Sequence, residues 1–152
     1  MTMLKYISRI ITGVVFIFSG TVKAVDPLGT TYKFQDYFTA FNLEFLKEYS
    51  LFFTVALCTL EFTAGISVLF NVRQRTGIWL VAIMMILFTP LTLFLALTNP
   101  VSDCGCFGDA IHLTNWQTFA KNIILLIPVL FLFIKRHEHI SFNGFRKEMI
   151  LI

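Results

Sequence analysis

Four long apolar runs constrain the fold of this 152-residue chain more than any other feature. They cover approximately residues 4–22, 51–70, 77–97 and 116–134. A helix rises about 1.5 Å per residue, so each run is long enough as a helix to span the ~30 Å hydrocarbon core of a bilayer. In lipid the backbone must satisfy its own hydrogen bonds, and a helix does so within one segment. The sequence therefore predicts an all-α integral membrane protein, a four-helix bundle that forms one transmembrane domain.

The composition supports a membrane location. Hydrophobic residues make up 57% of the chain and charged residues 14%, whereas soluble domains contain about 25% charged residues. Eighteen Phe residues add to this contrast, because a small water-surrounded core cannot bury so many rings. The chain therefore lacks the polar surface of a soluble protein, and membrane lipid is its first expected partner. The net charge of +3 does not indicate a nucleic-acid partner.

The basic residues predict how the helices are oriented. If four helices alternate, the side that holds both termini carries eight of them: Lys5, Arg9, Arg73, Arg75, Lys135, Arg136, Arg146 and Lys147. On the other side Lys23, Lys33 and Lys47 stand among acidic residues, and the loop 98–115 contains no Lys or Arg. By the positive-inside rule, both termini and the tail 135–152 face the cytoplasm and the loop faces outward. The first run lacks an A-x-A-like cleavage site, so we expect it to be retained.

The segment 31–49, between the first two runs, is too polar to cross the membrane. Its residues Phe34, Phe38, Phe41 and Phe45 recur at spacings of four, three and four, which is the period of one helical face. This pattern predicts an amphipathic helix that lies in the outer interface with its rings at headgroup depth. Such a helix either caps the bundle or covers a substrate.

Two cysteines separated by one glycine are the sharpest chemical feature of the chain. Cys104 and Cys106 flank Gly105 in the outward loop, and residues two apart in an extended chain project side chains the same way. A disulfide between them would close a very small ring with strained geometry. Strained, exposed disulfides tend to be labile or catalytic, and the loop is predicted to face an oxidising compartment. The pair is therefore predicted to exchange disulfides with a partner thiol.

Other interpretations of the cysteine pair stay open at this point. The two residues could form a permanent staple of the loop, bind a metal, or carry unpaired thiols. Asp103, Asp109 and His112 stand nearby but do not complete a convincing zinc set. His137 and His139 in the tail lack a third ligand in the sequence around them, so they are predicted to be solvated. No metal site is predicted.

A carboxylate in the second run is the other candidate for function. Glu61 lies near the middle of that run, where an ionised side chain is costly and usually marks a functional or paired site. It shares a helical stripe with Thr54, Cys58 and Gly65, at spacings of four, three and four. The stripe is predicted to face the bundle interior. Cys58 is either a third thiol that communicates with the loop pair or an inert buried thiol.

Two lysines could compensate the charge of Glu61. Lys121 lies about two turns inside the outer end of the fourth run, and Lys23 lies at the outer end of the first. Either could pair with Glu61 or extend to the interface. A cation near the loop would also favour thiolate over thiol and make a cysteine more nucleophilic. The alternative is that a Glu61–Lys121 pair only fixes the packing of the helices.

Residues around the first run resemble the DoxX family of four-helix membrane proteins. The resemblance rests on Arg9, Gly13, Ser19-Gly20, Lys23 and Asp26-Pro27. Glu61 and the outward loop Asp103-Cys104-Gly105-Cys106-Phe107-Gly108 are more specifically similar to its MauE-type branch. This resemblance implies a bundle in the bacterial inner membrane, a role in disulfide formation in exported proteins, and a thioredoxin-like partner. It also implies that Cys104 and Cys106 are the exchanging pair.

These observations favour a membrane component of extracytoplasmic thiol–disulfide redox. Cys104 and Cys106 would exchange disulfides, while Glu61 and Lys121 would shape the interior and relay protons. One alternative is a non-enzymatic membrane subunit that docks an envelope partner through the aromatic segment Tyr32–Tyr49. Another is a redox subunit that binds a quinone or small lipophile near Glu61. No cofactor is evident from the sequence, and a quinone is the one that the wider DoxX resemblance suggests.

Overall fold

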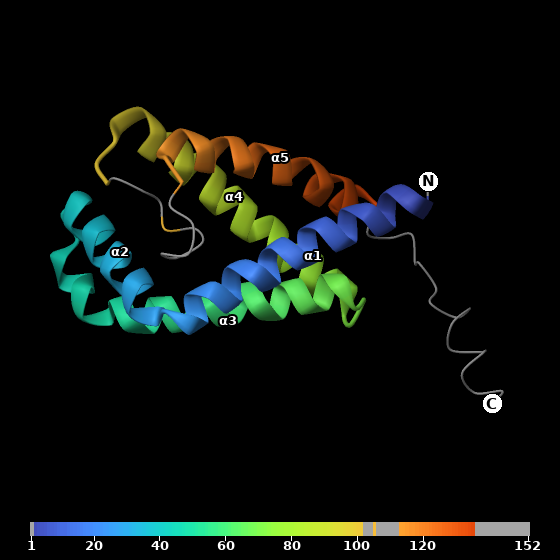
Figure 1. The fold of residues 1–152 in the computed structure, drawn as a ribbon, viewed down its shortest axis with the longest axis horizontal. Helices are drawn as coiled ribbons and strands as arrows, with labels where there is room; N and C mark the ends of the chain where they lie inside the picture. Colours follow the sequence, from blue (N-terminus) through green and yellow to red (C-terminus); the bar gives the residue numbers. More distant parts are fainter. Residues whose placement is uncertain (1, 102–104, 106–112, 136–152) are drawn as a thin grey trace.

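The computed structural model describes residues 2–101, 105 and 113–135 (Figure 1). This part of the chain consists of helices and the segments that join them, which confirms the all-α prediction. The elements are α1 (Thr2–Val25), α2 (Pro27–Ala40), the 3-10 helix η1 (Glu44–Tyr49), α3 (Ser50–Leu69), α4 (Gln74–Thr98) and α5 (Asn115–Ile134). Four helical segments are long and apolar enough to cross a membrane, namely α1, η1 with α3, α4 and α5. They contain the four predicted runs except for Phe70, which follows the last residue of α3.

The four long helices lie side by side, and the connections divide between two ends of the bundle (Figure 1). The N-terminus and the turn between α3 and α4 lie at one end. The opposite end holds the junction of α1 and α2, the helix α2 itself, the end of α4 and the start of α5. We call the first the terminal end and the second the loop end.

Two glycines bring α1 and α3 into close contact. A Cβ atom at Gly65 would lie 2.7 Å from the backbone N of Ile17, and one at Gly20 would lie 2.8 Å from the backbone N of Phe62. These contacts leave no room for a side chain at either position. Small residues allow such close approach between membrane helices, where dispersion contacts drive association. The α1–α3 pair therefore forms a rigid unit along which polar side chains can be positioned.

The apolar core lies between α1, α3, α4 and α5. Its buried members are Phe16, Ala64, Val68, Ile78, Val81, Ala82, Met84, Met85, Leu125, Val129 and Leu132. At the terminal end Arg9 is buried and donates to the carbonyl oxygens of Val68 (3.2 Å) and Leu69 (2.9 Å). These carbonyls belong to the last turn of α3, where the helix has no further N–H groups to hydrogen-bond to them. A cation there also complements the negative end of the helix dipole.

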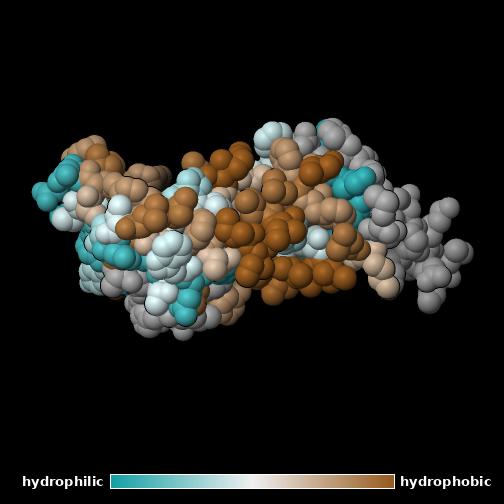
Figure 2. Space-filling view, turned by 90° about the horizontal axis from the view of Figure 1, so that it is seen from above, coloured by the Kyte–Doolittle hydropathy of each residue, from teal (hydrophilic) through white to brown (hydrophobic). Residues whose placement is uncertain are grey.

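Large apolar side chains cover the outside of the bundle. Examples that are more than half exposed are Ile7, Ile86, Leu87, Ile124, Ile127 and Ile134. Figure 2 shows such residues gathered across the middle of the molecule, with hydrophilic residues toward the loop end. Soluble proteins rarely expose an apolar surface of this extent, whereas lipid tails solvate it. The protein is therefore a membrane protein.

The segment predicted as one helix over 31–49 forms two elements. Helix α2 begins earlier, because Asp26 caps it by accepting from the backbone N–H of Gly29 at 3.0 Å and Pro27 occupies its first turn. It ends at Ala40, and Asn42 then adopts a left-handed conformation with φ 57°. That conformation interrupts the helical period, and η1 follows.

The aromatic residues of α2 pack onto the bundle. Phe38 lies 5.6 Å from Phe53 of α3 between ring centroids, and Phe34 lies 6.2 Å from the same ring. Phe41, just after α2, stacks on Phe94 of α4 at 5.6 Å. These contacts make α2 a cap over the loop end of the bundle. Phe45 in η1 is exposed, and the interfacial position of the segment stays a prediction.

Candidate functional site

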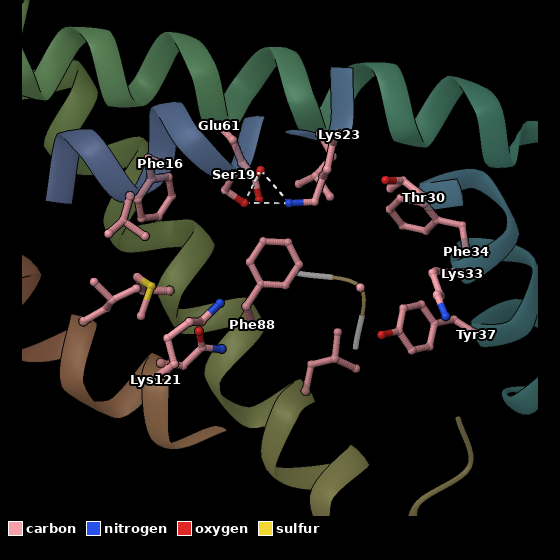
Figure 3. A pocket seen from close by; sticks show the side chains of 17 residues that line it. Phe16, Ser19, Lys23, Thr30, Lys33, Phe34, Tyr37, Glu61, Phe88 and Lys121 are labelled. Atoms are coloured by element: carbon pink, nitrogen blue, oxygen red, sulfur yellow. Dashed lines mark hydrogen bonds and ion pairs between the residues drawn. The ribbon is translucent and has the colours of Figure 1, made fainter. Parts of the chain in front are cut away.

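Three polar side chains meet between α1 and α3. Lys23 Nζ lies 2.8 Å from Glu61 Oε2 and donates to Ser19 Oγ at 2.7 Å, while Ser19 Oγ donates to Glu61 Oε2 at 2.9 Å. All three residues are buried, with Lys23 only 2% exposed. We call this group the Ser19–Lys23–Glu61 triad; Figure 3 shows it at one side of a cavity.

The helical period places the triad. Ser19 and Lys23 are one turn apart on the same face of α1, and Gly20 lets that face approach α3. The stripe of Thr54, Cys58, Glu61 and Gly65 is buried in α3, as its spacing predicted. The charges of Lys23 and Glu61 compensate each other where water is scarce. Leaving either one unpaired would cost several kcal/mol, about 3–5 by analogy with other buried pairs.

A cavity of about 100 Å³ adjoins the triad. Helices α1 to α5 all contribute to its wall, and most of the wall is apolar. The ring of Phe88 projects toward the centre of the view in Figure 3, with Phe16 to one side of it and Phe34 to the other. Polar groups other than the triad come from Thr30, Lys33 and Tyr37 of α2 and from Lys121 and Asn122 of α5.

The structure resolves which lysine forms the ion pair with Glu61. It is Lys23 of α1. Lys121 of α5 lines the same cavity and lies across it from Glu61 (Figure 3). Beside it, Asn122 donates to Thr92 Oγ1 of α4 at 3.2 Å, which ties α5 to α4 at this level. Both lysines named from the sequence therefore belong to one site.

Gly105, the middle residue of the Cys-Gly-Cys sequence, also lines this cavity. Its φ is +61°, a left-handed conformation that glycine adopts without strain. A Cβ atom here would lie 2.9 Å from Cγ of Lys33. Gly105 is therefore required both by the backbone and by the space next to Lys33. Cys104 and Cys106 lie outside the described residues.

Comparison with protein families then identifies the chain. The model described as methylamine utilisation protein MauE matches residues 1–135. The chain belongs to the MauE family. Searches of curated proteins and of solved structures find no match. The family match confirms the MauE-type resemblance, and its range contains α1 to α5, the triad and Gly105.

Cys58 lies within the fold of this MauE protein but away from its cavity wall. The free thiol is buried and contacts the carbonyl oxygen of Val55, 3.2 Å away, in its own helix. The carbonyl oxygen of Cys58 faces Gly20 of α1. Cys58 is not among the residues that line the cavity. The structure therefore brings together Glu61, Lys121 and the loop glycine, and does not add Cys58 to them.

The metal interpretations depend largely on residues outside the described ranges. Asp103, Asp109, His112, His137 and His139 all fall there. Within residues 2–101, 105 and 113–135, no three His, Cys, Asp or Glu side chains converge in a way that could hold a metal.

Sequence reasoning missed several polar members of the site in this MauE protein. Ser19 was not predicted as a site residue, although its position one turn before Lys23 was a usable signal. Asn122 follows Lys121 directly and was not considered. Thr30 was missed because the predicted helix began one residue later, at position 31. Lys33 was counted only as a charge, since nothing local in the sequence shows that α2 folds back over the bundle.

Proposed function

We propose that this MauE protein is a membrane component of extracytoplasmic thiol–disulfide metabolism, in which Cys104 and Cys106 exchange disulfides with a partner. The observation that carries the proposal is the position of Gly105. The residue between the two cysteines lies on the wall of a cavity that also contains a buried ion pair. A loop that only connected two helices would have no need to approach a cavity that contains a buried ion pair.

The proposal places the loop end outside the cytoplasm. The terminal end carries Arg9, Arg73 and Arg75, while the loop 98–115 contains no Lys or Arg. By the positive-inside rule, both termini then face the cytoplasm and Gly105 faces the periplasm across the inner membrane. Thiols on that side meet an oxidising compartment, in which disulfides persist.

The exchange itself needs two cysteines and a partner protein with two more. A thiolate from the reduced pair attacks one sulfur of the partner disulfide, whose S–S bond breaks as a mixed disulfide forms. The displaced partner thiolate takes up a proton. The second loop cysteine, having lost its proton, attacks the mixed disulfide and releases the partner as a dithiol. Two electrons have moved to the partner, and the reverse sequence oxidises it.

The surrounding charges suit this chemistry. Lys33 is adjacent to Gly105, and a nearby cation favours the thiolate form of a cysteine. In the proposal Glu61 and Lys121 keep the interior polar and carry protons released or consumed by the thiols. The proposal gives Cys58 no role in disulfide exchange, because its buried thiol does not line the cavity.

The partner in this proposal is an exported protein of the thioredoxin-like kind. The family description names methylamine utilisation. We infer that this chain serves such a system, or a comparable one, as the membrane subunit that sets the thiol state of an exported component. The subunit role rests on the family match and the membrane fold, and the exchange chemistry rests on the loop.

Trapping a mixed disulfide tests the proposal. With Cys104→Ser or Cys106→Ser, the remaining thiol lacks the neighbour that resolves the intermediate, so a disulfide-linked complex with an envelope protein is expected in membranes. The complex should disappear on reduction and should be absent from the double variant Cys104→Ser/Cys106→Ser. A Cys58→Ala protein serves as the matched control and should leave trapping unchanged. If neither single variant traps a partner and exported substrates stay normally oxidised, the exchange function is wrong.

A docking subunit without redox chemistry is the second candidate. Exposed aromatic residues at the loop end favour it, since Tyr32, Phe45 and Tyr49 are 60%, 71% and 57% exposed. Such rings suit either a headgroup layer or a protein partner. A stable complex with an envelope protein that survives loss of both loop cysteines, and is lost in Phe45→Ser, would support this function over exchange.

A further inference from the structure

One threonine hydroxyl in the cavity wall lacks the hydrogen bond that most other helical threonines make. Seven threonine hydroxyls in the described helices donate to the carbonyl oxygen four residues earlier, at 2.7 to 2.9 Å. Thr30 is only 3% exposed, yet its Oγ1 has no hydrogen-bond partner among the residues that the structure describes. It lines the cavity, and Figure 3 shows the hydroxyl turned toward the side of Lys23. A buried polar group normally has a partner. Thr12 and Thr89 also have hydroxyls without a partner among the described residues, but neither lines this cavity. The position of Thr30 on the cavity wall is what points to a ligand.

The next residue shows that the helix itself does not explain this. Thr31 is also buried, and its hydroxyl donates to the carbonyl oxygen of Pro27 at 2.7 Å and lies 3.1 Å from Thr54 Oγ1. It is not part of the cavity wall. Two adjacent threonines in one helix therefore face different surroundings. Thr30 faces the cavity, and Thr31 faces α3.

The size and lining of the space indicate what could fill it. Its volume of about 100 Å³ is several times the roughly 10–15 Å³ that one water requires. The rings of Phe16, Phe34 and Phe88 belong to the wall, and aromatic side chains pack well against another ring. Ligand sites commonly combine such apolar walls with a few polar groups that fix orientation. Lys23 and Glu61 compensate each other's charge, and Lys33 and Lys121 also line the space. An uncharged ligand with an electron-rich oxygen suits such a wall.

We propose that the cavity binds an uncharged, ring-bearing lipophile whose single carbonyl or hydroxyl oxygen hydrogen-bonds to Thr30. The ring packs among the phenylalanines, and the hydroxyl of Thr30 donates to or accepts from the oxygen. This site does not depend on disulfide exchange, because no cysteine of the described residues lines it. Failure of the exchange function would leave it standing, and the reverse also holds.

Three small probes that differ only at one position test the site in the full-length protein in detergent. Acetophenone carries a carbonyl, 1-phenylethanol carries a hydroxyl, and ethylbenzene carries neither. Their affinities follow from the rise in melting temperature with probe concentration, since a ligand of the native state stabilises it. Thr30→Val removes the hydroxyl and keeps the branched shape. It should weaken the better of the two oxygen-bearing probes by about three- to tenfold and change ethylbenzene binding by less than about twofold. The preferred probe distinguishes a carbonyl from a hydroxyl ligand.

Thr31→Val is the matched control, and stability provides an independent readout. Thr31→Val breaks existing hydrogen bonds, so it should lower the melting temperature and leave the relative probe affinities unchanged. Thr30→Val removes a hydroxyl that has no partner, so the melting temperature of the ligand-free protein should stay the same or rise. A purely structural role for Thr30 would not produce opposite effects on stability and binding.

Three results would overturn the proposal. Equal binding of all three probes would show a non-specific apolar void that lipid tails can fill. Unchanged binding of the oxygen-bearing probes in Thr30→Val would show that water alone satisfies the hydroxyl. Binding of none of the probes at concentrations that saturate the micelles would show that no ring enters the cavity.

Discussion

The terminal end and the loop end of the bundle use the same helix pair for different purposes. At the terminal end α1 and α3 are in close contact around Gly13 and Gly65, and the surrounding core is apolar. Arg9 donates hydrogen bonds to the last carbonyl oxygens of α3. At the loop end the same two helices carry the Ser19–Lys23–Glu61 triad and border a cavity capped by α2. Dense packing stabilises the bundle at one end. The buried charges and the cavity at the loop end reduce stability and create a site for chemistry or binding.

Breaking the triad should have the largest effect. Lys23→Met leaves Glu61 buried without its cation, and we expect a loss of about 3–5 kcal/mol in the free energy of unfolding. Denaturant titration of the full-length protein in detergent measures it. The double variant Lys23→Met/Glu61→Met removes both charges and should be more stable than Lys23→Met alone.

An exposed ion pair provides the control for that comparison. Lys47 and Glu44 lie 3.6 Å apart at the surface of η1, with side chains 36% and 72% exposed. Lys47→Met should therefore change stability by no more than about 1 kcal/mol. A loss in Lys47→Met as large as that in Lys23→Met would refute the difference between the two sites.

Adding a methyl group at the contact between α1 and α3 should have the next largest effect on stability. Gly65→Ala places a methyl group 2.7 Å from the backbone N of Ile17, so α1 and α3 must separate. We expect a loss of about 1–3 kcal/mol from overpacking, despite the better helix propensity of alanine. Thr63→Ala, at an exposed position of the same helix, should be nearly neutral. A Gly65→Ala protein as stable as the parent would show that the helices are not in close contact.

Removing the hydrogen bonds between Asn115, at the start of α5, and the residues that follow α4 should have a smaller effect on stability. Asn115 is 4% exposed and donates to the carbonyl oxygen of Val101 at 2.8 Å and to Asn99 Oδ1 at 3.1 Å. Asn115→Ala should cost about 1–2 kcal/mol and make the loop cysteines react faster with a maleimide. Asn99→Gly removes one of the two bonds and keeps the left-handed backbone, so its effect should be smaller. Equal effects would mean that the bond to Val101 contributes nothing.

The smallest effect is expected at Cys58. Its thiol is buried and does not line the cavity. Cys58→Ala should change unfolding free energy by about 1 kcal/mol or less and leave disulfide exchange unchanged. A loss of exchange in this variant would bring Cys58 into the chemistry after all.

Much of the fold could be predicted from the sequence because lipid imposes simple rules. The lengths of the apolar runs gave the helices, and the spacing from Thr54 to Gly65 gave the buried face that includes Glu61. The choice between Lys23 and Lys121 could not be predicted, since both lysines have long flexible stems and the outcome depends on how closely α1 approaches α3. The position of α2 over the cavity was also beyond reach, because it depends on contacts such as those of Phe34 and Phe38 with Phe53 of α3, which are distant in the sequence.

The measurement that tests the exchange function most directly is a redox titration of the loop pair. The full-length Cys58→Ala protein is equilibrated in glutathione buffers of different potential, and thiols are counted by mass-tag alkylation. We predict a reversible two-electron transition between a Cys104–Cys106 dithiol and a disulfide. In Lys33→Met the loop thiols should alkylate about threefold more slowly, because the adjacent cation is lost. A pair that stays in one state across all buffers, with alkylation rates unaffected by Lys33, would contradict disulfide exchange at the loop end.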